Sequence, residues 1–310
     1  MIGSPSRLEP ISAGIAASLS KPLDLEDFRS GDTRKTIREV FAHEVQATGG
    51  AWPTGSEYRK HWEVAMAVRA LRSHGALRPD AQILGVGAGN EPTLFWLTRH
   101  VARVFATDLY LGDEWDESAA PEMFTNPGRF WPAQWDPRRL VVQHMDGRDL
   151  THPDASFDGV FSSSSIEHFG TGEDVARAID EAYRVLRPGG VLSLSTELRI
   201  AGDGPGLPGI LLFTARQLDE LVVRRCPWEA GVSIDRPPSP ATLETCQQFE
   251  DVAADVRAHV AENGAILFHR LRWTTYPHLV LQHGEHIWTS VHLALRKPAM
   301  TTPRCSLGAA

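Results

Sequence analysis

The chain has 310 residues, of which 42% are hydrophobic, and a net charge of −8 at pH 7. This length exceeds one typical domain and suits a single α/β core with sizeable additions. The negative charge and the lack of a basic run argue against a nucleic-acid partner, and no segment has the apolar length that is needed to span a bilayer.

The cysteines and the N-terminal region predict a cytoplasmic protein. Cys226, Cys246 and Cys305 have no metal-binding spacing and cannot all pair within the chain, which favours a reducing compartment. The mildly apolar residues 11–19 lack a basic flank and a strongly hydrophobic centre, so we expect no signal peptide. The 13 histidines are scattered without a ligand motif, and no metal site is indicated.

The N-terminal region is predicted to form helices that pack on the domain after it. Residues 57–73 have a helical pattern, with Val64, Val68 and Leu71 on one stripe. A turn-rich joint, residues 48–55, precedes this helix. We expect the N-terminal helices to cover part of a ligand cleft in the next domain.

A glycine loop follows the first predicted strand. Residues 82–86 are a short apolar run, typical of a buried parallel strand, and Gly87 and Gly89 come next. Glycine permits a tight turn and the close approach of a ligand. Asn90 is expected to cap a helix that stops near residue 100, so that free N–H groups face a polar ligand. The alternative is an ordinary turn.

An acidic residue ends the second predicted strand, residues 104–108. Asp108 follows the glycine loop by about 20 residues, the offset at which a Rossmann-like domain places an acid against ribose hydroxyls. Its two oxygens can accept both hydroxyl protons. A solvated aspartate at a strand end is the alternative, and a nicotinamide enzyme would share both features.

Two more strands are predicted, residues 140–145 with Asp146 at their end, and residues 157–162. The connection before them, residues 110–139, is rich in aromatic residues, Trp115 among them, and in proline. A connection of this length is usually functional or disordered, and its aromatic residues argue against disorder. We expect it either to wall a substrate pocket or to cover a core.

A capped helix and a fifth strand follow. Thr171 and Asp174 form a predicted capping box, and residues 175–186 carry apolar side chains at helical spacing. The Arg-Pro-Gly-Gly run of residues 187–190 ends the helix, and residues 191–195 are predicted to be a strand.

The last third of the chain is predicted to hold a helical insertion and a closing hairpin. Residues 201–209 are too rich in glycine and proline for regular structure. Two helices are expected next, residues 213–222 and 243–260, with the proline-rich residues 235–240 joining them. Two antiparallel strands, residues 279–283 and 287–296, are expected to follow.

The glycine loop, Asp108 and residues 146–169 together resemble a known pattern. Over residues 79–199 the chain resembles the class I (Rossmann-like) S-adenosylmethionine-dependent methyltransferases, and within them the small-molecule branch with a Glu-His pair after the fourth strand. The resemblance implies an α/β fold with a doubly wound, seven-stranded, mostly parallel sheet. The divisions expected are an N-terminal helical extension (1–78), a cofactor-binding core (79–200), a cap or substrate insertion (201–262), closing antiparallel strands (263–299) and a tail (300–310).

The resemblance implies S-adenosyl-L-methionine as the cofactor and assigns residues to it. Asp108 would bind the ribose, Asp146 would accept from the adenine amino group, and the N–H groups of Gly147 and Arg148 would meet the ring. A dinucleotide enzyme has no reason to carry an acid like Asp146. The predicted cofactor residues are Gly85, Gly87, Gly89, Glu91, Asp108, Leu109, Asp146, Gly147, Arg148, Ser162 and Ser163.

Two positions depart from the family pattern. Gly85 stands where an acidic residue is usual, and Glu91 stands where a third glycine is common. The first change removes a side chain that often anchors the glycine loop or the methionine end of the cofactor. Glu91 either supplies a replacement carboxylate near the cofactor's amino group or is a helix-start residue favoured by the helix dipole.

Methyl transfer starts from an activated sulfonium, so the enzyme mainly positions the reactants and excludes water. A hydroxyl acceptor needs a general base. Glu167 and His168 are the predicted catalytic residues, because they follow the fourth strand at the edge where ligands of open α/β sheets bind. The alternative is that His168 only holds its loop over the cofactor. The weaker candidates are Glu197, His283 and His286.

The predicted function is methyl transfer to a hydroxyl of a small molecule. A saccharide or a glycosylated metabolite is the first choice, because residues 163–170 resemble a stretch of bacterial methyltransferases associated with saccharide assembly. An amine N-methyltransferase is the runner-up, since a neutral amine needs no base. A non-catalytic S-adenosylmethionine-binding protein is the third hypothesis. The acceptor, the metal dependence and the oligomeric state stay open, with a homodimer as one option.

Overall fold

The computed structural model describes residues 19–29, 31–52, 58–112, 119–229, 232, 234, 236–271, 273–274 and 277–299. The predictions for residues 11–18 and for the tail, together with Trp115 and Cys305, lie outside this part of the chain. None of the described helices is long and apolar enough to cross a membrane.

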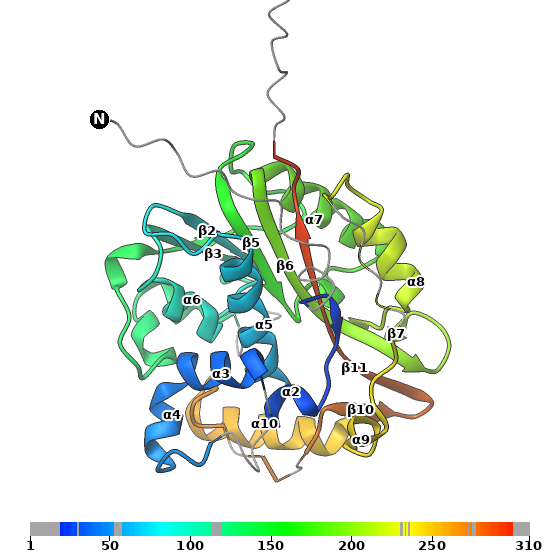
Figure 1. Ribbon diagram of the computed structural model, residues 1–310. Coiled ribbons are helices and arrows are strands. Elements are labelled where there is room, and N and C mark those ends of the chain that lie inside the picture. Colours follow the sequence, from blue (N-terminus) through cyan, green and yellow to red (C-terminus); the bar gives the residue numbers. More distant parts are fainter. Residues whose placement is uncertain are drawn as a thin grey trace, which may run out of the picture.

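One sheet organises the described residues (Figure 1). In spatial order its strands are β4 (Leu140–His144), β3 (Arg103–Asp108), β2 (Gln82–Val86), β5 (Phe157–Ser163), β6 (Leu186–Ala201), β11 (His286–Arg296), β10 (Val280–His283) and β9 (Cys246–Gln248), and β1 (Lys21–Pro22) also pairs with β11. The strands from β4 to β6 are parallel. β11 runs antiparallel to both β6 and β10.

The predicted seven-stranded, doubly wound sheet is the path from β4 to β10, and two short strands extend it. β9 pairs in parallel with β10, and β1 pairs antiparallel with β11. The prediction missed both because two or three residues carry no strand periodicity of their own.

Helices and short turns join and cover the strands. They are α2 (Glu26–Arg29), α3 (Gly31–Val40), α4 (Ala42–Ala47), α5 (Arg59–Ser73), α6 (Pro92–Leu97), α7 (Gly172–Val185), α8 (Ala215–Leu218), the π-helical η5 (Asp219–Val223), α9 (Pro240–Leu243), α10 (Phe249–Asn263), and the 3-10 turns η1 (Pro121–Phe124), η2 (Pro127–Phe130), η3 (Pro137–Arg139) and η4 (Ile166–His168). A small hairpin joins β7 (Gly206–Leu207) to β8 (Ile210–Leu211).

The two faces of the sheet bury two separate cores, because successive strand residues point to opposite faces. Ile83 of β2 lies in the core that contains Trp62 and Leu71 of α5. The next residue, Leu84, lies in the core that contains Val175 and other apolar residues of α7. Burial on both faces explains why these strands are continuous apolar runs in the sequence.

The predicted capping box at the start of α7 is confirmed. The hydroxyl of Thr171 accepts from the Asp174 amide, and the Asp174 carboxylate accepts from the Thr171 amide at 2.8 Å. The helix ends at Val185 and β6 begins at the next residue, so the strand includes the Arg-Pro-Gly-Gly run. The pairing of β5 with β6 shifts in register at this point.

Two predicted helix starts are wrong. Asn90 does not cap α6: its side-chain amide donates to the Ile266 carbonyl at 3.0 Å, and Glu91 occupies the cap position. The helix predicted over residues 243–260 begins at Phe249, because residues 246–248 pair with β10 as a strand instead. Long-range pairing overrides local helical periodicity there.

The aromatic segment of residues 110–139 covers a core. In its described part Tyr110, Phe130 and Trp131 are almost fully buried. The Trp131 ring stacks on Phe95 of α6, with ring centroids 6.2 Å apart. In its described part the segment therefore packs over a core, which is one of the two roles predicted for it.

Candidate active site

A cavity of about 330 Å³ lies at the carboxyl ends of β2, β3, β4 and β5, and we call it the cofactor cavity. This is the edge where open α/β sheets bind their ligands. The described residues that line it are Lys60, Gly87, Ala88, Gly89, Asn90, Glu91, Asp108, Leu109, Met145, Asp146, Gly147, Arg148, Ser165, His168, Phe169, Gly170 and Phe268.

The glycine loop bounds this cavity after β2. Gly87 has a φ of +57°, a conformation that side chains rarely adopt, and a Cβ atom there would lie 1.7 Å from the Ser165 hydroxyl oxygen. The Tyr110 hydroxyl donates to the Gly89 carbonyl at 2.6 Å and holds the loop from outside. The loop therefore requires glycine at position 87 for both its turn and its close packing.

Asp108 holds the other side of the same loop. Its carboxylate accepts from the amides of Gly89 and Leu109, each at 2.7 Å. Burial raises the pKa of Asp108, and the two amide hydrogen bonds oppose that shift. These backbone donors therefore orient the Asp108 carboxylate, which is predicted to bind the ribose, at the end of β3.

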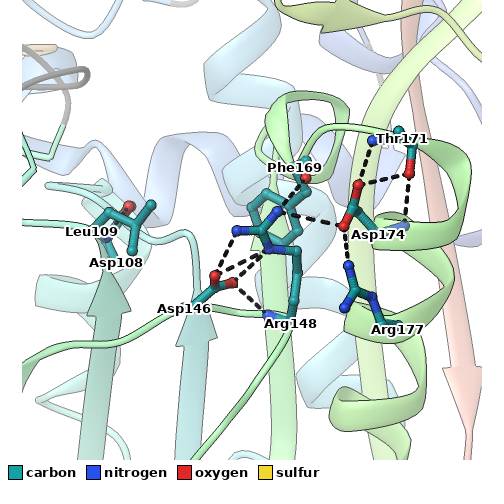
Figure 2. A network of polar contacts seen from close by, with 8 residues as sticks. All are labelled: Asp108, Leu109, Asp146, Arg148, Phe169, Thr171, Asp174 and Arg177. Atoms are coloured by element: carbon teal, nitrogen blue, oxygen red, sulfur yellow. Dashed lines mark hydrogen bonds and ion pairs between the residues drawn. The ribbon is translucent and has the colours of Figure 1, made fainter.

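Asp146 lies at the end of β4 and binds Arg148 (Figure 2). The Arg148 amide donates to Asp146 at 2.8 Å and its guanidinium at 2.7 Å, and these bonds lower the pKa of Asp146. The guanidinium also donates to the Phe169 carbonyl and lies 3.5 Å from Asp174, so it ties the loop after β4 to the loop after β5. The prediction had the Arg148 amide meeting the adenine ring, but in the structure it donates to Asp146.

Most of the predicted cofactor residues line this cavity. Gly85, Ser162 and Ser163 do not, because they lie within β2 and β5, beneath the loops. A Cβ atom at Gly85 would lie 2.8 Å from the Phe161 ring and 2.7 Å from Ala88, so the space for the family's acidic side chain is filled. The lining residues that the sequence analysis missed are Lys60, Ala88, Asn90, Met145, Ser165, Phe169, Gly170 and Phe268.

Glu91 brings a carboxylate into the cofactor cavity from the start of α6. Its Oε1 pairs with the Lys60 ammonium at 2.7 Å, and its Oε2 is buried without a hydrogen-bond partner among the described residues. Lys60 also pairs with Glu63, one turn along α5, at 2.8 Å. Burial raises the pKa of Glu91, and the charge of Lys60 opposes that shift.

A second cavity of about 660 Å³ adjoins the first. We call it the acceptor cavity because the predicted catalytic residues Glu167 and His168 line it. His168 lines both. The other described residues of its lining are Tyr58, Arg59, Ser164, Glu167, Glu197, Ile210, Phe249, Val252, Ala253, Val256, Arg257, Val260, Ala261, Ile266, Trp273, His278, Leu281 and Trp288.

Glu167 and Glu197 lie together on the wall of the acceptor cavity. The Thr196 hydroxyl donates to Glu167 at 2.8 Å, and Arg59 of α5 pairs with Glu197 at 2.7 Å. Burial, together with the nearby charge of Glu197, raises the pKa of Glu167 to about 8. Glu167 therefore carries its proton at neutral pH.

His168 has its ring held in one tautomer. Its Nδ1 lies 2.8 Å from the Gly209 carbonyl oxygen, which can only accept, so Nδ1 donates and Nε2 is the basic nitrogen of the neutral ring. Burial lowers the pKa of His168, which keeps the ring neutral near pH 7. Of the weaker candidates, Glu197 lines the acceptor cavity, whereas His283 and His286 line neither cavity.

The raised pKa of Glu167 predicts a pH-dependent stability. The unfolded carboxyl loses its proton near pH 4.5 and the folded one near pH 8. Because the folded protein binds more protons across this window, its free energy of unfolding falls as the pH rises through it. We expect Glu167→Gln to reduce this fall, as measured by urea unfolding at pH 6 and pH 8.5, and the exposed Glu173→Gln to leave it unchanged. An equal fall in Glu167→Gln would contradict the assignment.

Among the described residues, no group of histidine, cysteine, aspartate and glutamate side chains could hold a metal ion. The lining of the two cavities instead offers hydrogen-bonding groups, among them the neutral imidazole of His168. The arrangement can bind a polar ligand in the cofactor cavity and present it to a second molecule beside His168.

Comparisons with known proteins agree with this fold. Residues 84–194 match a family described as a methyltransferase domain. The solved structure of a putative sarcosine dimethylglycine methyltransferase from Galdieria sulphuraria is similar with a TM-score of 0.50 and 14% identity, over 84% of this chain and 98% of that one. Because the identity is low, this likeness shows the fold alone.

Two curated relatives match in sequence. Over 125 residues the chain is 34% identical to a 27-O-demethylrifamycin SV methyltransferase from Amycolatopsis mediterranei, which is 40% of this chain and 41% of that protein. Over 134 residues it is 29% identical to a 2-methyl-6-phytyl-1,4-hydroquinone methyltransferase from Oryza sativa, which is 43% of this chain and 36% of that protein. The matches thus span less than half of the relatives' lengths. Residues 84–194 therefore carry a methyltransferase domain, in agreement with the resemblance found in the sequence.

Proposed function

We propose that this protein transfers a methyl group from S-adenosylmethionine to a hydroxyl of a small molecule. The observation that carries the proposal is that His168 lines both cavities, at the place where a cofactor methyl group and an acceptor would meet. The A. mediterranei relative, whose name describes an O-demethyl substrate, supports a hydroxyl acceptor. A cytoplasmic location stays a prediction, and the oligomeric state stays open, with a homodimer as one option.

In this proposal three acidic residues of the cofactor cavity each bind a different part of the cofactor. Asp108 accepts from the ribose hydroxyls, as an acid at this strand end does in Rossmann-like domains. Asp146 accepts from the adenine amino group beside Gly147, where a Cβ atom would lie only 2.6 Å from Val86. Glu91 turns its unpartnered Oε2 to the ammonium of the methionine end.

The bound cofactor supplies an electrophilic methyl group on a sulfonium. The protein's own part is to hold the acceptor in line, exclude water and accept the hydroxyl proton. His168 accepts that proton on Nε2, while the Gly209 carbonyl steadies Nδ1. Glu167 keeps its own proton at neutral pH and is placed to hydrogen-bond the acceptor.

Glu91→Gln is expected to weaken binding of S-adenosylmethionine by about fivefold, because a neutral amide holds an ammonium roughly half as strongly as a carboxylate does. Isothermal titration calorimetry measures this. Glu91→Gln also leaves Lys60 without one of its two carboxylate partners. Thermal unfolding of the variant therefore has to show that the fold is intact. Unchanged affinity would remove Glu91 from the cofactor site and leave it as a helix-start residue.

Two measurements test the proposed function. Calorimetry should show binding of S-adenosylmethionine and S-adenosylhomocysteine and none of NAD. Mass spectrometry of reactions with hydroxyl, saccharide and amine acceptors should show a product heavier by one methylene. Cofactor binding without product from any class would favour the non-catalytic alternative. Product from amines alone, with no loss of rate on His168→Ala, would favour the N-methyltransferase.

A further inference from the structure

The acceptor cavity is apolar along most of its length. Helix α10, the orange helix that crosses the lower part of Figure 1, lines it with Phe249, Val252, Val256 and Val260. These positions recur at intervals of three and four, so they form one face of the helix. The side chain of Val256 is only half-buried, as expected for a residue that lines a cavity.

Aromatic and aliphatic side chains form the facing wall. Trp288 of β11 lies with its ring 5.6 Å from Phe249, and the Trp273 ring lies 4.6 Å from that of Tyr58. Leu281 of β10 also lines this wall. A cavity of about 660 Å³ with such walls is within the range of sites that enclose a drug-sized apolar molecule.

A group of polar lining residues lies beside the cofactor cavity. Glu167 and His168 belong to the turn after β5, and Ser164 precedes them. Ser164 has a φ of +52°, an unusual conformation for a residue with a side chain. Its hydroxyl is buried without a hydrogen-bond partner among the described residues. A strained residue with an unsatisfied hydroxyl is typical of a ligand site.

Three ionisable groups in the described lining of the cavity offer no net charge to an acceptor at neutral pH. Arg59 and Glu197 neutralise each other at 2.7 Å, and Glu167 keeps its proton. Arg257 also lies on the lining but is exposed. Since a charge in an apolar cavity loses its hydration without compensation, an acceptor whose charge lies in the buried part of the cavity would bind poorly.

We propose that the acceptor is an uncharged, mainly apolar ring compound with a hydroxyl at one end. Its apolar body lies between α10 and the Trp273–Trp288 wall, and its hydroxyl lies beside Ser164, Glu167 and His168. This inference rests on the proposed function and narrows its acceptor to a class that excludes saccharides. A sugar would place several hydroxyls against apolar walls, where their lost hydrogen bonds to water are not replaced.

The first test compares ligands on the protein saturated with S-adenosylhomocysteine. Calorimetry would use 2-naphthol as the apolar hydroxyl probe, methyl β-D-maltoside as the saccharide and 2-naphthylmethylammonium as the cation. We expect 2-naphthol to bind at least about tenfold more tightly than either of the others. Equal or tighter binding of the maltoside or of the cation would overturn the inference.

A matched pair of variants tests whether 2-naphthol binds in the acceptor cavity. Val256→Asn puts an amide on the cavity face of α10, and Ala258→Asn puts the same amide on its exposed face. We expect the first to weaken 2-naphthol binding by about tenfold and the second to leave it unchanged, with S-adenosylhomocysteine affinity equal in both. If both variants bind 2-naphthol as the wild type does, the apolar body lies elsewhere and the inference fails.

Turnover separates this inference from the proposed function. Methylation of the maltoside without binding of 2-naphthol would overturn the apolar acceptor and leave the methyltransferase function intact. Binding of 2-naphthol that is lost in Val256→Asn, with no methylated product from any hydroxyl acceptor, would overturn the proposed function and leave the cavity's preference for apolar ligands standing.

Discussion

Asp108→Ala is expected to weaken binding of S-adenosylmethionine by about 1.5–3 kcal/mol, which is about 10- to 150-fold. The carboxylate is the group proposed to hold the ribose hydroxyls, and it also fixes the Gly89 amide at 2.7 Å. The alanine variant therefore loses a charged acceptor and the hydrogen bond that shapes the glycine loop. Isothermal titration calorimetry with S-adenosylhomocysteine measures the loss without turnover.

Asp80→Ala is the control for this experiment. Asp80 is an exposed aspartate that pairs only with Arg78 among the ion pairs of the described residues. The Asp80→Ala variant should bind the cofactor as tightly as the wild type does. Asp108→Asn adds a second comparison, because the amide oxygen can still accept one hydrogen bond. If Asp108→Ala keeps wild-type affinity, the ribose is held elsewhere and the assignment of the cofactor cavity is wrong.

His168→Ala is expected to lower the rate of hydroxyl methylation by about 100-fold or more, the usual contribution of a general base. Affinity for S-adenosylhomocysteine should change little, because the ring is proposed to face the acceptor. His168→Gln should be nearly as slow, since glutamine keeps a hydrogen bond but cannot take the proton. His283→Ala, an exposed histidine outside both cavities, should retain full activity. A nearly active glutamine variant would remove His168 as the base.

The pH profile separates His168 from Glu167 as the base. Burial lowers the pKa of His168 below 6.5, so a histidine base is neutral and the rate has reached its plateau by pH 7. The pKa of Glu167 is raised to about 8, so a glutamate base would make the rate rise through pH 8. We expect the first profile in the wild type. The second, together with an active His168→Gln, would assign the base to Glu167.

The cofactor half of the site was largely predictable because each part is local in sequence. Residues 82–86 form β2 with the predicted bounds, since a buried parallel strand must be apolar throughout. Asp108 and Asp146 follow directly from strand ends, and the ends of parallel strands meet at one edge of the sheet. Local reasoning could not tell which residues at a strand end face the cavity. Ser162 and Ser163 end β5 at the same edge of the sheet but do not line the cavity.

The acceptor half was predicted only in part. Glu167, His168 and Glu197 were named from the sequence and line the acceptor cavity. The contacts that join segments far apart in the chain were not predicted. Arg59 meets Glu197 only after α5 packs on the sheet, and a lysine such as Lys60 three residues before Glu63 looks like an ordinary surface pair. The start of α10 was hidden because residues 246–248 pair as a strand with β10. Tertiary contacts of this kind leave no periodic signal in the sequence.

The first turn of α5 joins the two cavities. Arg59 extends to Glu197 in the acceptor cavity, and the next residue, Lys60, extends to Glu91 in the cofactor cavity. A shift of this turn when one ligand binds would alter the partners of the other. Such coupling is reciprocal by thermodynamic necessity: whatever factor the cofactor adds to the affinity for the acceptor, the acceptor must add to the affinity for the cofactor. The demethylated cofactor and the methylated product would then change each other's binding affinity by the same factor and in the same direction.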